Sequence, residues 1–195
     1  VILRGFWFGL SAIALLALLP VVVRETLNAT AFVYGVMLGC FGMGAVAGAL
    51  SNASLRNRFT NEIIARGGFV VFGLSCVLLA FSVQPVLSGA ALMLAGAAWV
   101  LALSMFNVTI QLSTPRWVVG RVIALYQTGT FGGMAAGSLL WGAIAERTGN
   151  AEVALLGAAG MLAVGALIGL RLPLPEFSGL DLGPLNRFKE PATRF

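Results

Sequence analysis

The sequence contains no histidine, one lysine and only two cysteines among its 195 residues. Without histidine, the chain cannot form a Ser–His or Cys–His nucleophile pair or a histidine metal site. The single lysine, Lys189, lies in the carboxyl-terminal tail, away from the apolar segments in which a Ser–Lys pair would have to form. Cys40 and Cys76 lie inside apolar runs, and we interpret both as small buried residues. These absences argue against an enzyme and against a metal-binding protein.

Charge is also scarce. Charged residues make up 10% and apolar residues 59% of the chain, whereas soluble domains have about 25% and 45–50% respectively. The mean hydropathy is +0.96. A soluble protein of this size has too little interior to bury so much apolar surface. The composition therefore excludes a soluble globule, a disordered chain and a disulfide scaffold, and it indicates an integral membrane protein with the lipid bilayer as its first partner.

Six apolar runs are long enough to cross a bilayer as helices, which requires about 20 residues each. We expect them at 5–23, 32–55, 67–83, 87–112, 122–145 and 153–170. Open sheets cannot face lipid, and the runs lack the alternation typical of a barrel. The prediction is an all-α transmembrane domain over residues 1–171, followed by a cytosolic, proline-containing tail at 172–195 without a fold of its own.

The cations predict the orientation. With the segments assigned to alternate sides of the membrane, ten of the twelve basic residues fall on one side. Cationic loops stay in the cytoplasm, so both termini of this segment are predicted to be cytoplasmic, in the cell (inner) membrane. We interpret the net charge of +5 as this topology signal and expect no nucleic-acid partner. The chain starts Val1-Ile2-Leu3 with no signal peptide, so we expect the numbering to begin inside a longer protein.

A short repeat suggests two related halves. Gly39-Cys40-Phe41-Gly42 in the second run matches Gly129-Thr130-Phe131-Gly132 in the fifth, at an offset of 90 residues. Such matches also arise by chance in a sequence rich in Gly, Ala and Leu. The second and fifth runs cross in opposite directions, so the six helices are predicted to form two inverted three-helix repeats, a transporter signature.

Three segments carry a family resemblance: 115–126, which reads PRWVVGRVIALY, 142–149, which reads GAIAERTG, and the tail at 172–182. The sequence resembles the carboxyl-terminal half of a major facilitator superfamily transporter, and within it the efflux branch that includes the enterobactin exporter. The resemblance implies helices seven to twelve of a twelve-helix protein. It also implies that an amino-terminal six-helix half is the partner and supplies the other wall of a central cavity.

The superfamily's loop signature, G-x-x-x-D-R-x-G-R-R/K, is present in part. Gly48 and Arg56 stand in register, but Asn52 replaces the acidic residue that, in the family, belongs to a gate-locking charge relay. Arg116 and Arg121, in the next loop expected on the same side, are either topology anchors or gating residues. The resemblance thus makes Gly48, Asn52, Arg56, Arg116 and Arg121 candidates for the gate.

Uncharged polar side chains are the candidates for the cavity wall. Asn107 and Gln111 share one helix face, as do Gln127, Thr130 and Phe131 on the next helix. Phe41 is a candidate for a soft apolar wall. The alternative for all of them is helix packing, with the polar groups bonding between helices. Gly129, Gly133 and Gly137 recur every four residues and are predicted to let helices pack closely.

The predicted function is half of a secondary active transporter, exporting small amphipathic, drug-like or siderophore-like molecules by alternating access. The alternative is a non-transporting membrane scaffold or a degenerate transporter fragment. No charge is expected at a helix centre, because Glu25, Glu62, Glu146 and Glu152 all fall at span ends or in loops. No cofactor is expected. If export is coupled to proton entry, the proton-carrying carboxylate is expected in the amino-terminal half.

Overall fold

The computed structural model describes residues 1–27 and 29–171, and the tail predicted at 172–195 lies outside these residues. The described chain is helical, with no strand in it. The helices are α1 (Ile2–Val21), the π-helix η1 (Val22–Thr26), α2 (Ala31–Arg56), α3 (Asn61–Phe81), α4 (Pro85–Ser113), α5 (Val119–Thr148) and α6 (Ala151–Arg171).

Helix α3 begins six residues before the predicted start of the third span. Its N-cap is Thr60, whose hydroxyl accepts a hydrogen bond from the backbone N–H of Ile63 at 3.4 Å. The third span was predicted to start at 67 because Asn61, Glu62 and Arg66 interrupt the apolar run. They form the first turns of α3 instead, since Glu62 finds cationic partners inside the bundle.

Other helix ends follow local chemistry. Pro85 starts α4, where its missing N–H leaves no hydrogen bond unmade. Helix α5 ends at Gly149, whose φ of 63° is the left-handed conformation that suits glycine. Pro20 removes a backbone donor near the end of α1, and the helix continues as the wider η1 from Val22.

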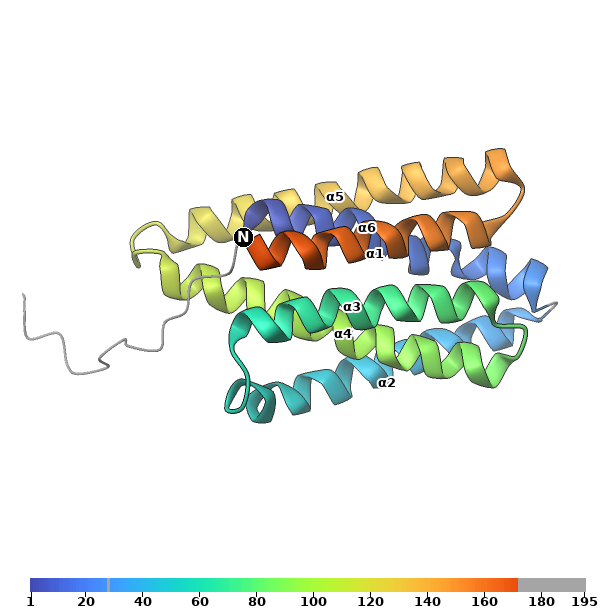
Figure 1. Ribbon diagram of the computed structural model, residues 1–195, viewed down its shortest axis with the longest axis horizontal. Helices are drawn as coiled ribbons and strands as arrows, with labels where there is room; N and C mark the ends of the chain where they lie inside the picture. Colours follow the sequence, from blue (N-terminus) through green and yellow to red (C-terminus); the bar gives the residue numbers. More distant parts are fainter. Residues whose placement is uncertain (28, 172–195) are drawn as a thin grey trace, which may run out of the picture.

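The helices form two groups of three, and each helix runs antiparallel to the one before it in the chain (Figure 1). In one group α1 packs against α5 and α6, and in the other α4 packs against α2 and α3. The two groups meet mainly through α3 and α6. As a result α2 and α5 each lie at an outer edge of the bundle, while α1, α3, α4 and α6 form its centre (Figure 1).

Aromatic side chains fill the centre of the bundle. Phe8 on α1 contacts Phe69, Phe72, Trp99 and Phe106, with ring centroids 5.0–6.3 Å apart. These rings come from α1, α3 and α4, so one residue of the first helix joins both groups. Such edge-to-face pairs add to the packing energy of an interior that lipid surrounds.

Five helices of the described chain are long and apolar enough to cross a membrane: α1 with η1, α2, α3, α4 and α6. Helix α5 has 30 residues but is not among these five, because Gln127, Thr128, Thr130 and several glycines interrupt its apolar run. Five of the six predicted spans thus have the character of membrane helices. A sixth crossing requires the polar side of α5 to face something other than lipid.

Candidate functional site

The two edge helices carry most of the candidate residues and are the least covered. Helix α2 buries 17% of its apolar span, whereas the other four candidate spans bury 44–56%. Helix α5 buries five residues along one stripe: Tyr126, Thr130, Gly133, Gly137 and Trp141. Each edge helix is therefore attached by one narrow face, and its remaining faces are open.

The polar candidates separate into open and packed positions. Gln111 on α4 and Gln127 on α5 are exposed, and Phe131 is 62% exposed. Asn107 is partly buried, and its Nδ2 donates to the carbonyl of Leu103 in its own helix at 2.9 Å. Thr130 differs from the others, since it is buried against α1 and its hydroxyl donates to the carbonyl of Tyr126 at 3.0 Å. The structure thus places Thr130 in a helix contact rather than on the open face.

Phe41 links an edge helix to the aromatic centre. Its ring lies 6.2 Å from that of Trp99 on α4, and Trp99 in turn lies 5.8 Å from Phe8. Phe41 and Trp99 are both partly exposed. They form an apolar wall at the α2–α4 contact, beside the interior.

The loop-motif residues on α2 lie in the contact with α4. Gly48 packs on the backbone of Ala97, and Asn52 donates from Nδ2 to the hydroxyl of Ser104 at 2.8 Å. An amide therefore makes a neutral hydrogen bond where the family's signature has a carboxylate. Arg56, at the end of the same helix, is exposed. Arg116 and Arg121, around the α4–α5 loop, are exposed as well.

Glycines bring the backbones of the edge helices against their neighbours. Among the predicted packing glycines, Gly133 and Gly137 leave no room for a methyl group, because the carbonyls of Phe6 and Leu10 on α1 lie there. Gly129 is less tightly held, with the Cγ2 of Ile2 at 3.3 Å from where its Cβ would be. Small residues at such positions allow dispersion contacts between whole backbones.

The α2–α4 contact has the same construction as the α5–α1 contact. Six contacts of glycine on a backbone carbonyl form three matched pairs: Gly133 on Phe6 with Gly44 on Met93, Gly137 on Leu10 with Gly48 on Ala97, and Gly9 on Thr130 with Gly96 on Phe41. In every pair the α2 and α5 residues are 89 positions apart, and the α1 and α4 residues are 87 apart. The matched contacts thus relate α2 to α5 at an offset of 89, one residue less than the offset of 90 in the sequence match.

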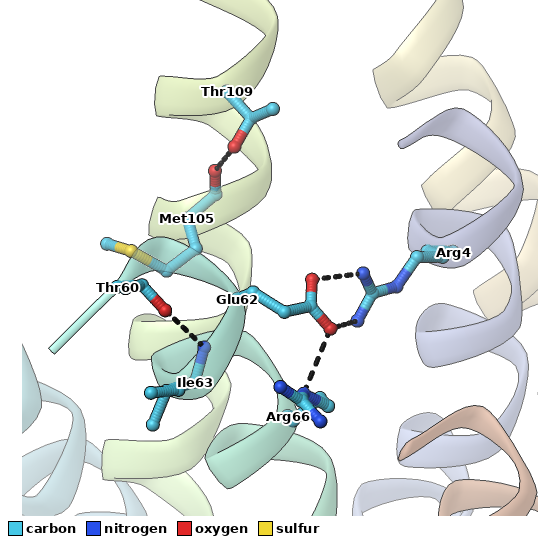
Figure 2. Close-up of polar contacts among 7 residues, drawn as sticks. All are labelled: Arg4, Thr60, Glu62, Ile63, Arg66, Met105 and Thr109. Carbon is cyan, nitrogen blue, oxygen red and sulfur yellow. Dashed lines mark hydrogen bonds and ion pairs between the residues drawn. The ribbon is translucent and has the colours of Figure 1, made fainter. Parts of the chain in front are cut away.

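A buried ion cluster joins α1 and α3 at one end of the bundle (Figure 2). Arg4 donates to both carboxylate oxygens of Glu62, at 2.7 and 3.2 Å, and Nε of Arg66 lies 3.1 Å from Oε1. Glu62 is only 3% exposed. The guanidinium of Arg4 also lies about 6 Å from the rings of Phe69 and Phe106. Gly169 of α6 closes the cluster, since a methyl group there would lie 2.6 Å from the carboxylate.

Sequence comparison identifies the family. A family model described as transmembrane secretion effector, of the major facilitator type, matches residues 1–195. The chain belongs to this family. No curated protein matches the sequence. Membership of the transmembrane secretion effector family, together with the apolar helices, makes the chain a multi-pass membrane protein of the major facilitator transporter type.

In this family member the ion cluster was not predicted from the sequence. Arg4 and Arg66 were counted as topology signals and Glu62 as a span-end residue, whereas the three form one buried group. The spacing of Glu62 and Arg66, four residues on a helix, was the available signal. The ion pair between Arg4 and Glu62 could not be predicted from the sequence, because 58 positions separate the two residues.

The described part of this family member offers hydrogen-bonding groups and apolar surface on its edge helices. Within residues 1–27 and 29–171, no group of three or more Cys, Asp or Glu side chains is arranged to hold a metal ion. The open polar candidates Gln111 and Gln127 are amides, which donate and accept hydrogen bonds without carrying charge.

Proposed function

We propose that this chain is the carboxyl-terminal half of a secondary active exporter in the cell membrane, which moves small amphipathic, drug-like or siderophore-like molecules by alternating access. Its partner is an amino-terminal six-helix half. The observation that carries the proposal is the pair of edge helices, α2 and α5, each attached by one glycine stripe and open elsewhere. In lipid, the polar side of α5 needs another protein surface or a water-filled cavity.

The matched glycine contacts support an inverted repeat. Helices α1 and α2 correspond to α4 and α5 in these contacts, which is the correspondence expected if three helices are repeated. Because three is an odd number of crossings, the second set runs in the opposite direction. Inverted repeats in transporters rock around a site at their interface near the bilayer midplane.

The open side chains are proposed to line the solute path. Gln111, Gln127 and Asn107 supply hydrogen-bonding groups, and Phe41 and Phe131 supply apolar surface. An amphipathic solute needs both kinds of contact. We do not assign Thr130 to the path, because α1 covers it.

The proposal places both termini of the segment in the cytoplasm and places any proton-carrying carboxylate in the amino-terminal half. Among the described residues, Glu62 is the one carboxylate buried in the bundle, and two arginines hold it. A carboxylate engaged in this way is suited to joining helices rather than to carrying protons. Exposed Arg56 at the end of α2, Arg116 in the α4–α5 loop and Arg121 in the first turn of α5 keep their proposed role as topology anchors or gating residues.

Efflux tests the proposal. Cells that express the chain with its amino-terminal half should expel ethidium or an iron-free catecholate siderophore faster than cells without it. Gln127→Ala should slow efflux several-fold. Thr128→Ala is the matched control, because Thr128 is also exposed but points about 100° away around the helix. If neither solute is expelled although the two halves purify together, the chain is a non-transporting membrane scaffold.

A further inference from the structure

An apolar groove of about 260 Å³ opens on the surface of the bundle along α3 and α4, beside α2, whose Leu55 belongs to the lining. Its lining consists entirely of apolar side chains and glycine, with Phe59, Ile63 and Val71 on one side and Leu94 and Leu101 on α4 at its base. Phe59, Ile63, Val71 and Leu94 are 36–49% exposed, so the groove is open to the surroundings of the protein.

The groove exists because α2 and α3, although consecutive, lean on α4 rather than on each other. Gly48 brings α2 onto Ala97, and Gly68 brings α3 onto Ala98 and Ala102. Gly67 removes a side chain from the wall, and nothing lies within 4 Å of where its Cβ would be. Between Ile63 and Val71 the groove follows α3 for about 12 Å, which is close to the hydrocarbon depth of one leaflet, about 15 Å.

Two cations lie at the end of this groove. Arg56 and Arg58 flank Asn57 in the α2–α3 connection, and the residues on either side of them, Leu55 and Phe59, line the groove. Both arginines are exposed, and within residues 1–27 and 29–171 no carboxylate forms an ion pair with either of them. The nearest acidic residue in the chain, Glu62, is already held by Arg4 and Arg66.

We propose that this groove is a binding site for an anionic phospholipid, with one acyl chain between α2 and α3 and the phosphate held by Arg56 and Arg58. Arginine binds phosphate through two parallel N–H groups, which fixes a headgroup more firmly than a point charge does. Basic pockets between membrane helices at the headgroup level recognise anionic lipids. The site requires only that the chain lies in a membrane, so it is independent of transport and of orientation.

The α5–α6 pair, which like α2–α3 joins an edge helix to a central helix, supports this assignment. Between α5 and α6 the ring of Trp141 occupies the space, lying against Gly157 of α6 and donating from Nε1 to the carbonyl of Leu10 at 2.8 Å. In the register of the matched glycine contacts, Trp141 corresponds to Asn52 on α2. The chain therefore fills one of the two related spaces with its own side chain and leaves the other to lipid.

The test measures which lipid the protein retains. The purified full chain is equilibrated with equal amounts of phosphatidylglycerol and phosphatidylcholine of identical acyl chains, and bound lipid is counted by native mass spectrometry. We expect phosphatidylglycerol to be retained preferentially, and Arg56→Gln with Arg58→Gln to reduce that preference by about fivefold for each arginine. Arg116→Gln with Arg121→Gln removes the same charge at the same end of the bundle and should leave the preference unchanged.

A second variant tests the acyl-chain contact. Gly67→Leu places a side chain in open space inside the groove, and it should lower the retention of both lipids several-fold. Gly160→Leu, also in open space but on α6, should have no effect. Equal loss from both arginine pairs, or no lipid preference in the unmodified chain, would overturn the proposal. So would a second copy, or the amino-terminal half, crosslinking to Phe59→Cys in place of lipid.

Discussion

Arg4 and Glu62 stand 58 positions apart in the chain, yet their side chains form a two-pronged ion pair that ties the first turn of α1 to the first turn of α3 (Figure 2). The pair is buried on both sides, and Gly169 of α6 provides the room for it. Three helices from both three-helix groups therefore meet at one carboxylate.

Loss of this carboxylate should destabilise the bundle. Glu62→Gln leaves the buried guanidinium of Arg4 without its counter-charge, and breaking a buried ion pair from one side costs about 3 kcal/mol. Arg66→Gln is the matched control, because Arg66 is 29% exposed and Arg4 still holds the carboxylate. We expect its effect to be below about 1 kcal/mol. Thermal unfolding in detergent measures both, and equal effects would contradict the role assigned to Arg4.

Substitution of the adjacent α5 glycines Gly132 and Gly133 by alanine should have different effects on stability. A methyl group at Gly133 meets the carbonyl of Phe6, so Gly133→Ala should push α5 away from α1 and destabilise the protein by about 1–3 kcal/mol. Gly132 faces open space, and Gly132→Ala should be neutral or slightly stabilising because alanine favours helix. The same thermal unfolding assay compares the two. Destabilisation by both would mean that α5 is not attached through the Gly133 stripe.

The helices were predictable and their contacts were less so. Long apolar runs separated by charged or proline-containing loops predicted where helices lie, because a helix in lipid is specified by its own residues. The start of α3 was missed since Glu62 becomes compatible with a buried turn only after Arg4 of another helix is placed beside it. The matched glycine contacts could not be predicted for a related reason: each glycine contacts a particular carbonyl, and a sequence does not show which backbone approaches it.

The candidate site was predictable only as a set of residue types. Periodicity placed Gln127, Thr130 and Phe131 on one side of α5, but it could not show that α1 covers Thr130 and leaves the other two exposed. Nor could it show that Asn52 bonds to Ser104, or that Arg56 lies at the end of a groove. These properties depend on which neighbour occupies each helix face.

Labelling should place the two ends of the bundle in different compartments. Phe59, in the α2–α3 connection, and Asn150, in the α5–α6 connection, lie at opposite ends of the helices (Figure 1). In a background with Cys40→Ala and Cys76→Ala, Phe59→Cys should react with a membrane-impermeant maleimide only from the cytoplasm. Asn150→Cys should react only from the outside. Reaction of both cysteines from the same side would contradict the six-span topology and, with it, the transporter proposal.

Replacement of two tryptophans should separate structural from interfacial roles. Trp141 is 3% exposed and lies among α1, α5 and α6, so Trp141→Ala opens a cavity and leaves the carbonyl of Leu10 without this donor. We expect a loss of about 3–5 kcal/mol in unfolding free energy. Trp117, in the α4–α5 loop, is 83% exposed, and Trp117→Ala should change stability little. If Trp141→Ala also raises the number of phospholipids retained, the emptied space has become a second lipid groove, as its correspondence to the α2–α3 groove requires.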